Sequence, residues 1–227
     1  MGTEAGRLAG GWLVKGRIFL NGGERRAQKL RLAAGLPLVL LLSACEGAGI
    51  LATGDPYTKL AQAHTLWRNE GRVMQARRLV EQAIVIFDER GDKAGLAQAY
   101  WEYGLVARIG GANADPVIYY LHPESIAEHK PTLEELDLSD DYLARSAALA
   151  SEVRRLDIVF NANLFLGNNQ VLRGDNQKSC AFYDLALAAG HDANRQQPEI
   201  RFDLPKGAHS IDEFLENAKS KAGCPPA

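Results

Sequence analysis

The sequence predicts an all-α fold: a short α-solenoid of helical hairpins with an irregular insertion and a C-terminal capping helix. Two observations carry this prediction. Apolar residues recur at helical spacing over residues 57–111 and 139–190, and two of these segments repeat the same offsets of small and aromatic residues. No stretch of any length alternates apolar and polar residues, so a β-rich fold is disfavoured. The length of 227 residues and the hydrophobic content of 46% suit one globular domain or two small ones.

Three helices are expected in the first half of the helical region. The first breaks at Gly71, the second covers 73–90, and the third covers 94–109 and stops at the pair Gly110-Gly111. The residues expected to face the core are Tyr57, Leu60, Ala61, His64 and Trp67 in the first helix, and Ala76, Leu79, Val80, Ala83, Ile84 and Phe87 in the second.

Residues 112–138 interrupt this pattern and are expected to form the irregular insertion. They contain three prolines, which prevent one continuous helix: Pro116, Pro123 and Pro131. A helix resumes at about Asp140 and is expected to pair with the next one, which starts near residue 157.

The C-terminal part of the chain is expected to be an extended segment followed by a small capping helix. Ser210 and Glu213 have the spacing of a capping box, in which each side chain binds a backbone N–H that has no partner within the helix. Gly223 is expected to end this helix.

A repeated spacing of small residues organises the predicted helices. Leu166-Gly167 precede Gly174, and small, aromatic and alanine positions follow at Ser179, Tyr183 and Ala186. The same offsets recur around Gly71, with Ala63-His64 before it and Ala76, Val80 and Ala83 after it; Tyr103-Gly104 with Gly111 match the first half. This pattern resembles the tetratricopeptide repeat (TPR), in which small residues let two antiparallel helices approach closely.

The resemblance implies a solenoid that binds peptides or proteins along a concave face lined by the first helix of each pair. The usual proline at the repeat end is missing from both full copies. His64, Asn163 and Gln170 are unusual at their positions. An unrelated array of α-hairpins is therefore an open alternative.

The segment before the helical region has the order of an export signal. The charges of Arg25, Arg26, Lys29 and Arg31 precede about ten mostly apolar residues, 33–42, and then Ser43-Ala44 and Cys45. This stretch is too short to span a bilayer as a helix. The pattern resembles the bacterial lipoprotein signal, which implies a diacylglyceryl group on the Cys45 sulfur and cleavage just before it. The alternatives are a buried apolar segment with a chance cysteine and an uncleaved membrane anchor.

The domain boundaries follow from this resemblance. Residues 1–44 are expected to be the signal peptide, 45–56 a tether, and 57–227 the helical domain. About thirty residues precede the apolar stretch, so a translation start at Val14, Leu20 or Leu30 is an alternative to Met1. Glu46 favours the outer membrane, because retention in the inner membrane typically uses Asp at this position. The resemblance thus predicts a lipid-anchored protein that faces the periplasm.

The charge distribution differs between the two sides of Cys45. Residues 1–45 carry seven Lys or Arg and two Glu, whereas residues 46–227 carry 19 basic and 26 acidic residues. Nucleic-acid binding needs clustered basic residues against the phosphates, so the net charge of −7 after Cys45 argues against it.

Cys180 and Cys224 are the two cysteines left if Cys45 carries lipid. An exported protein meets an oxidising compartment, so we expect a disulfide that ties the capping helix to the last helical pair. Two free thiols, or pairing with another chain, are the alternatives.

No catalytic or cofactor-binding motif is evident, so we expect neither an enzyme nor a cofactor. The segment 122–129 (HPESIAEH) comes nearest to a metal site, but it lacks the spacing of a zinc site and is expected to be solvated. The expected function is therefore binding of a protein or peptide partner in the cell envelope. The candidate contacts on the concave face are Trp67, Tyr100, Asn163 and Gln170. The alternatives are an enzyme or ligand-binding protein that uses the 112–138 insertion, and a permanent structural subunit.

Overall fold

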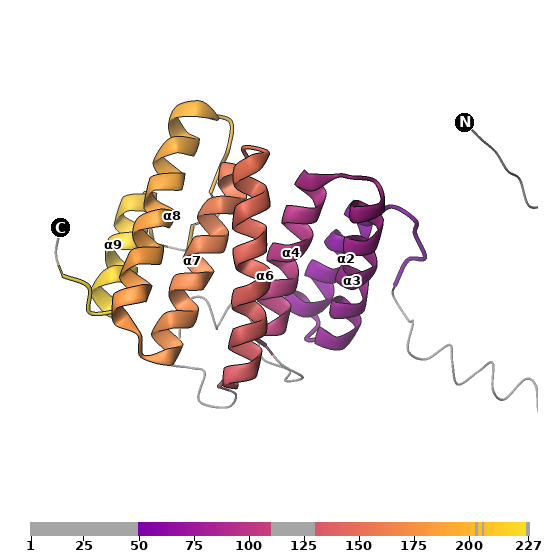
Figure 1. Ribbon diagram of the computed structural model, residues 1–227, viewed down its shortest axis with the longest axis horizontal. Coiled ribbons are helices and arrows are strands. Elements are labelled where there is room, and N and C mark those ends of the chain that lie inside the picture. Colours follow the sequence, from indigo (N-terminus) through magenta and orange to yellow (C-terminus); the bar gives the residue numbers. More distant parts are fainter. Residues whose placement is uncertain (1–49, 110–129, 203, 206, 226–227) are drawn as a thin grey trace, which may run out of the picture. The chain divides into compact units, whose positions relative to one another are not determined.

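The computed structural model describes residues 50–109, 130–202, 204–205 and 207–225 (Figure 1). All regular secondary structure among these residues is helical, which confirms the all-α prediction. The helices are α2 (Pro56–Asn69), α3 (Val73–Glu89), α4 (Lys93–Ala107), α6 (Leu133–Glu152), α7 (Leu156–Arg173), α8 (Asn176–Gln196) and α9 (Ile211–Lys221). They belong to one compact unit, residues 50–227. The predicted signal peptide and Cys45 lie outside the described residues.

Each helix packs against the next one along the chain, and α4 has the most neighbours among them. It contacts α2, α3, α6 and α7. Residues 95–109 are buried except for Gln98 and Trp101. A helix that is buried on every side needs apolar residues around its whole circumference, and α4 meets this condition with only one charged residue, Glu102, after its first turn.

The first two helices match the predicted ranges, but the buried face of α2 differs from the predicted one. Tyr57 and Ala61 are exposed, and Ala63 and Leu66 are buried instead. The reason is that α2 contacts only α3 and α4 among the described helices, so its opposite side faces solvent. The predicted stripe of α3 is buried, except for the partly exposed Ile84.

Helix α6 begins earlier than the sequence suggested. Its first residue is Leu133, so residues 133–138, which we expected in the insertion, are helical. The start is fixed by a capping box: the Thr132 hydroxyl accepts from the Glu135 N–H at 3.2 Å, and the Glu135 carboxylate accepts from the Thr132 N–H at 2.7 Å. Residues 110–129 lie outside the described part of the chain.

Helix α6 packs on α7, as predicted, and also on α4, which the sequence did not reveal. Two serine hydroxyls join it to α4: Ser139 donates to the Gly104 carbonyl and Ser146 to the Ala97 carbonyl, both at 2.8 Å. Leu143 lies between these serines and packs so close to Gly104 that a Cβ on the glycine would lie 2.7 Å from its Cγ. Small residues on both helices therefore set the distance between α4 and α6.

Several helices end in a left-handed residue that reverses the chain direction. Gly91 after α3 has φ 63° and Gly174 after α7 has φ 77°, values that glycine adopts without steric penalty. The corresponding residue after α6 is Arg154, with φ 58°. Its N–H bonds to the Ser151 carbonyl and the next N–H to the Ala150 carbonyl, which is the Schellman arrangement. The turn geometry is therefore kept even where no glycine is present.

Three helices begin with an aspartate cap that comes directly after a glycine in the sequence. Asp55, Asp92 and Asp175 each accept a hydrogen bond from the backbone N–H three residues on. These bonds stabilise the carboxylate form. The backbone hydrogen bond from Gly95 lowers the pKa of Asp92, and the side-chain hydrogen bond from Lys178 lowers the pKa of Asp175.

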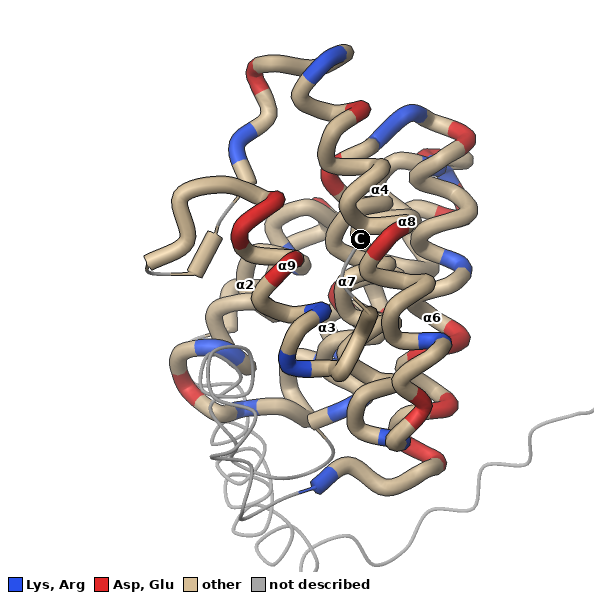
Figure 2. The backbone as a smooth tube through the Cα atoms, turned by 90° about the vertical axis from the view of Figure 1, so that its left-hand side faces the viewer, with Lys and Arg blue, Asp and Glu red and all other residues tan. Residues whose placement is uncertain are grey.

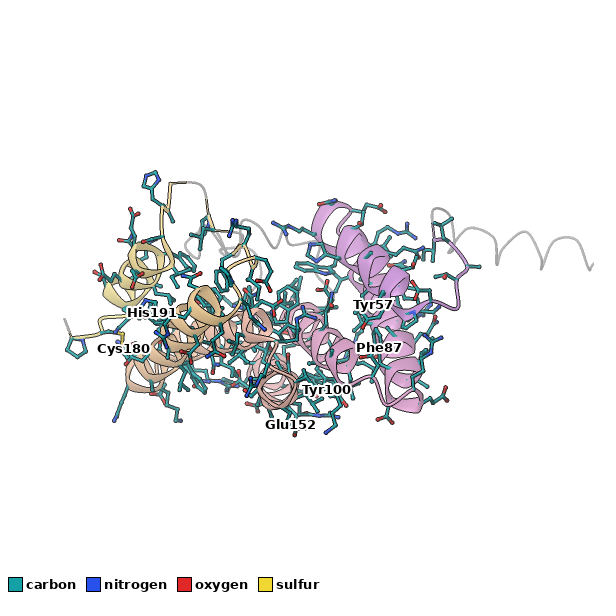
Figure 3. The ribbon with its side chains drawn as sticks, turned by 90° about the horizontal axis from the view of Figure 1, so that it is seen from above. Tyr57, Phe87, Tyr100, Glu152, Cys180 and His191 are labelled. Atoms are coloured by element: carbon teal, nitrogen blue, oxygen red, sulfur yellow. A yellow bond between two sulfur atoms is a disulfide. The ribbon has the colours of Figure 1, made fainter. Side chains whose placement is uncertain are left out.

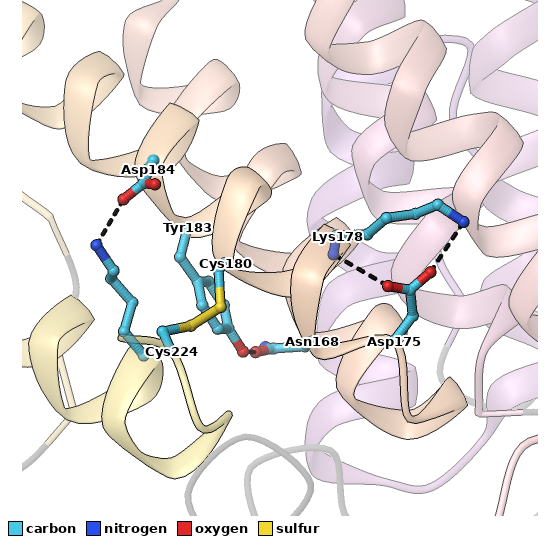
Figure 4. The surroundings of a disulfide bond; sticks show 8 residues. Asn168, Asp175, Lys178, Cys180, Tyr183, Asp184 and Cys224 are labelled. Atoms are coloured by element: carbon cyan, nitrogen blue, oxygen red, sulfur yellow. Dashed lines mark hydrogen bonds and ion pairs between the residues drawn. A yellow bond between two sulfur atoms is a disulfide. The ribbon is translucent and has the colours of Figure 1, made fainter. Parts of the chain in front are cut away.

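The C-terminal helix α9 packs on α8, and its start and end agree with the sequence. The Ser210 hydroxyl accepts from the Glu213 N–H at 3.1 Å, and Gly223 ends the helix with φ 72°. The predicted disulfide between Cys180 and Cys224 is present, with 5.7 Å between the two Cα atoms (Figure 4). It links the second turn of α8 to Cys224, three residues after the last residue of α9.

Candidate partner-binding surface

The four predicted contact residues lie in four different places of the fold. Trp67 is in α2, Tyr100 in α4, and Asn163 and Gln170 are in α7. Each is buried, with between 5% and 7% of its surface exposed. The structure therefore does not gather them on one face, and each place has to be considered separately.

Tyr100 belongs to a stack of three tyrosines and two arginines, which we call the tyrosine stack: Arg77 of α3, Tyr100 and Tyr103 of α4, and Tyr142 and Arg145 of α6. The rings of Tyr103 and Tyr142 have centroids 4.1 Å apart, and those of Tyr100 and Tyr142 are 5.6 Å apart. The Arg77 guanidinium lies 5.1 Å from the Tyr103 centroid, and that of Arg145 lies 4.1 Å from the Tyr100 centroid. Both arginines are thus held against aromatic rings by cation–π contacts.

Hydrogen bonds fix the stack at both ends. The Tyr103 hydroxyl accepts from Arg77 Nε at 2.8 Å and donates to the Glu81 carboxylate at 3.0 Å. Burial raises the pKa of Tyr103, with the negative charge of Glu81 acting in the same direction and Arg77 opposing both. At the other end, Arg145 donates to the Tyr100 hydroxyl. The rings of Tyr100 and Tyr103 are buried and that of Tyr142 is partly exposed, while the guanidinium groups reach the surface.

The exposed part of the stack consists of its two guanidinium groups. The side chains of Arg145 and Arg77 are 47% and 33% exposed. Among the described residues, Arg145 donates to Tyr100 and pairs with Asp141 at 3.7 Å, and Arg77 pairs with Glu81 at 3.6 Å. A guanidinium held by tyrosines loses little conformational entropy when it binds a carboxylate or carbonyl, and Tyr and Arg are enriched among the residues that dominate protein interfaces.

Trp67 belongs to a buried polar cluster between α2 and α4. Its indole N–H donates to Oε1 of Glu102, which is 3% exposed. His64 Nδ1 lies 3.0 Å from the same oxygen, and His64 Nε2 lies 3.2 Å from Arg68. Because arginine can only donate, we assign Nε2 as the acceptor and Nδ1–H as the donor to Glu102. This cluster uses its polar atoms internally and joins the two helices.

Asn163 lines an open groove of about 420 Å³ over α7, between α6 and α8. The walls are mostly small or apolar side chains: Ala147, Ala148 and Ser151 of α6, Leu156, Val159 and Asn163 of α7, and Leu185, Ala189 and Asp192 of α8. The amide of Asn163 donates to the Val159 carbonyl of its own helix at 2.8 Å. Leu185 is 54% exposed at this groove.

Gln170 takes part in a network that joins α6 and α7. Its amide donates to Asp140 Oδ2 at 3.0 Å, and Asn169 donates to Asp140 Oδ1 at 2.7 Å. Arg173 pairs with Asp140 at 3.2 Å and with Asp137 at 2.6 Å. These bonds join α6 to α7, although Asn169 Oδ1 and Arg173 Nε are buried without a hydrogen-bond partner among the described residues.

All four places include side chains that reach solvent, among them His64 and Asp137, and of the four the tyrosine stack is the one that combines exposed guanidinium groups with aromatic rings. Four residues of the stack were not predicted: Arg77, Tyr103, Tyr142 and Arg145. They lie on three helices that are separated by up to 68 positions, and no short motif marks them. Figure 2 shows basic and acidic residues interspersed along the described backbone, so charge clustering gave no signal either.

Other kinds of site find no support in the described part of the chain. It contains no group of three or more His, Cys, Asp or Glu residues placed to hold a metal ion. No helix there is long and apolar enough to cross a membrane. The segment 122–129 and most of the 112–138 insertion lie outside the described residues, so the alternative sites predicted there stay predictions.

No protein-family model matches this chain, and no curated protein or solved structure is significantly similar to it.

Proposed function

We propose that the protein is a TPR-like, lipid-anchored scaffold of the bacterial cell envelope that binds a protein partner through the tyrosine stack. The observation that carries this proposal is the pair of arginines held against buried tyrosines with partly exposed guanidinium groups. The partner is expected to present carboxylate or carbonyl oxygens to these groups.

The TPR-like part of the proposal is supported by the packing of the repeated positions. Ser179 and Ala186 have no exposed surface, and Tyr183 fills the space left by the glycine of the preceding helix. A Cβ on Gly167 would lie 2.6 Å from the Tyr183 ring, so only glycine permits this approach. The positions Ser139, Leu143 and Ser146 of α6 repeat the spacing of Ser179, Tyr183 and Ala186 and are equally buried. Such regularity favours three repeats: α2–α3, α4–α6 and α7–α8.

The anchor and location are supported by the sequence. The order of basic residues, apolar stretch, small residues and Cys45 is that of a lipoprotein signal, and Glu46 favours the outer membrane. Because α2 starts only eleven residues after Cys45, the helical domain would lie close to the membrane surface. Two or three acyl chains on the new N-terminus would hold it there stably.

The partner proposal is tested by affinity capture from detergent-solubilised envelopes with three tagged proteins: wild type, Arg145→Ala and Arg195→Ala. Arg195 is a matched control, because it is 69% exposed on α8 and pairs with Asp192, three residues earlier. A protein retained by wild type and by Arg195→Ala, but reduced about tenfold with Arg145→Ala, supports the proposal. Equal recovery with all three proteins contradicts it. Circular dichroism spectra establish that both variants keep the helical fold.

Lipidation is tested separately with the Cys45→Ala variant. Wild type is expected to incorporate labelled palmitate and to partition into membranes, whereas the variant does neither. If neither protein takes up the label and both still partition into membranes, the lipid anchor is wrong while the partner proposal stands.

A further inference from the structure

We propose that the Cys180–Cys224 disulfide is a redox switch: a dithiol reductant breaks it and releases α9 from α8. This inference is independent of the partner and of the lipid anchor. It rests on how α9 is attached to the rest of the helical unit.

The helix α9 is held by contacts with α8 that include the pair between Asp212 and His191 at 2.7 Å near its start. At the level of backbone packing it contacts α8 and no other described helix. Within its 11 residues, Ile211 and Leu215 are the buried ones. A helix of this length is marginal in water without packing, so its helical state depends on these contacts.

The disulfide fastens the end of α9 that the chain leaves free. The N-terminal end of α9 is connected to α8 by residues 197–210, whose Phe202 packs against Phe160 with 4.5 Å between ring centroids. At the other end, Cys224 follows the last turn and bonds to Cys180. Other contacts at this end are those of Ala222, which is 4% exposed, and the ion pair between Lys219 and Asp184 at 2.6 Å (Figure 4). Asp184 is 60% exposed, so solvent weakens the pair.

The release of α9 would uncover a face of α8 built to receive a helix. Gly190 of α8 admits the Ile211 side chain of α9, since a Cβ there would lie 2.7 Å from Ile211 Cδ1. Both cysteines are partly exposed, so a reductant can reach the bond without prior unfolding.

The reaction is a thiol–disulfide exchange in which a dithiol is the reductant. One thiolate of the dithiol attacks one of the two sulfurs and forms a mixed disulfide, and the other protein sulfur leaves as a thiolate that takes up a proton. The second thiol of the reductant then displaces the remaining protein sulfur. The protein gains two electrons and two protons and carries two thiols, while the reductant becomes an internal disulfide.

The test measures backbone hydrogen exchange by mass spectrometry on the full chain before and after treatment with dithiothreitol under native conditions. Alkylation of both cysteines in the treated protein verifies that the bond is reduced in the folded state. We expect the amides of α9 to exchange at least tenfold faster after reduction, and by a larger factor than the amides of α2–α4. A Cys180→Ser/Cys224→Ser variant is expected to reproduce this pattern without reductant.

The matched control is Asp184→Asn, which removes the ion pair and leaves the disulfide in place. It is expected to change the exchange of α9 less than threefold. Three results overturn the inference: a disulfide that resists the dithiol in the folded protein, α9 amides whose exchange rate does not change, or an acceleration of equal size in α2–α4 and α9. The last result would show that the bond stabilises the whole unit and holds no separate helix.

Discussion

The two ends of the helical unit are stabilised in different ways. The block α2–α4 has a continuous core of eighteen buried apolar residues among those described, centred on α3 and α4. The block α7–α9 has a smaller one of eight, to which the disulfide adds a covalent link. A small apolar core buries too little surface to hold its outermost element firmly, and a disulfide is the usual supplement. Apolar packing therefore stabilises the first block, whereas packing and a covalent bond together stabilise the second.

The largest effect is expected from truncation in the first block. Phe87 is fully buried and packs edge-on against Tyr57 at 4.8 Å between centroids (Figure 3). Phe87→Ala should lower the free energy of unfolding by about 3–5 kcal/mol, measured by urea denaturation. Leu215→Ala in α9 should lower it by about 2 kcal/mol, because α9 can shift into the space at the edge of the unit. If Phe87→Ala and Leu215→Ala lower the free energy of unfolding equally, the two blocks are not stabilised in different ways. Val85→Ala, an exposed change in α3, is the control and should stay within about 0.5 kcal/mol of wild type.

A smaller effect is expected in α6, which joins the two blocks. Ser139 donates to the Gly104 carbonyl of the first block and accepts from Asn169 of the second at 2.9 Å. Ser139→Ala leaves both partners buried without this bond, so the free energy of unfolding should fall by about 1–3 kcal/mol. Ser151→Ala removes an exposed hydroxyl that bonds only within its own helix, and it should be nearly neutral in the same denaturation experiment. A neutral Ser139→Ala would mean that apolar packing alone joins the blocks.

A gain in stability is expected at the turn between α6 and α7. Arg154 holds a left-handed conformation that glycine holds at the other turns, and this conformation is unfavourable by about 1–2 kcal/mol for residues with a side chain. Arg154→Gly should therefore raise the free energy of unfolding by about 1 kcal/mol. Gly174→Ala at the next turn should lower it by a similar amount. If both changes destabilise, Arg154 makes contacts that outweigh the backbone strain.

The smallest effect concerns the aspartate caps, one in each block. The folded-state pKa values of Asp92 and Asp175 are lowered by hydrogen bonds to the carboxylates. Their stabilising contribution is complete above the unfolded pKa near 3.8 and is lost as the pH falls through the lower folded value. Carboxyl shifts measured by NMR during an acid titration should give midpoints below 3.8 for both residues. A midpoint at or above 3.8 for either one would show that its cap is not formed in solution.

Much of the helical framework was predictable from local pattern. The ranges of α2, α3 and α4 follow from apolar spacing and from glycines that end helices, since both signals act within a few residues of the chain. The start of α6 was misplaced because Leu133 lies close to Pro131, although Thr132 and Glu135 carry the capping-box spacing. The capping-box spacing of Thr132 and Glu135 marks the start of α6 at Leu133.

The candidate site could not be predicted in the same way. Trp67, Tyr100, Asn163 and Gln170 were predicted as contacts on the concave face of a solenoid, and all four are buried. Their burial depends on which helices cover α2, α4 and α7, and the sequence of these helices alone does not contain that information. The pairing of Cys180 with Cys224 was predictable because only two cysteines remained after Cys45.

The all-α class, most of the helix ranges and the capping of α9 were predictable from the sequence, because each depends on residues close together in the chain. The pairing of Cys180 with Cys224 was predictable because few partners were available. Three arrangements are visible only in the folded structure. Helix α6 packs on α4 across the insertion, and the Glu102 carboxylate accepts from Trp67 and His64. Arg77 and Arg145 lie against the tyrosine rings at the two ends of the tyrosine stack. These arrangements form between residues far apart in the chain, where many pairings are compatible with the same periodicity and only the packing of complete helices selects one.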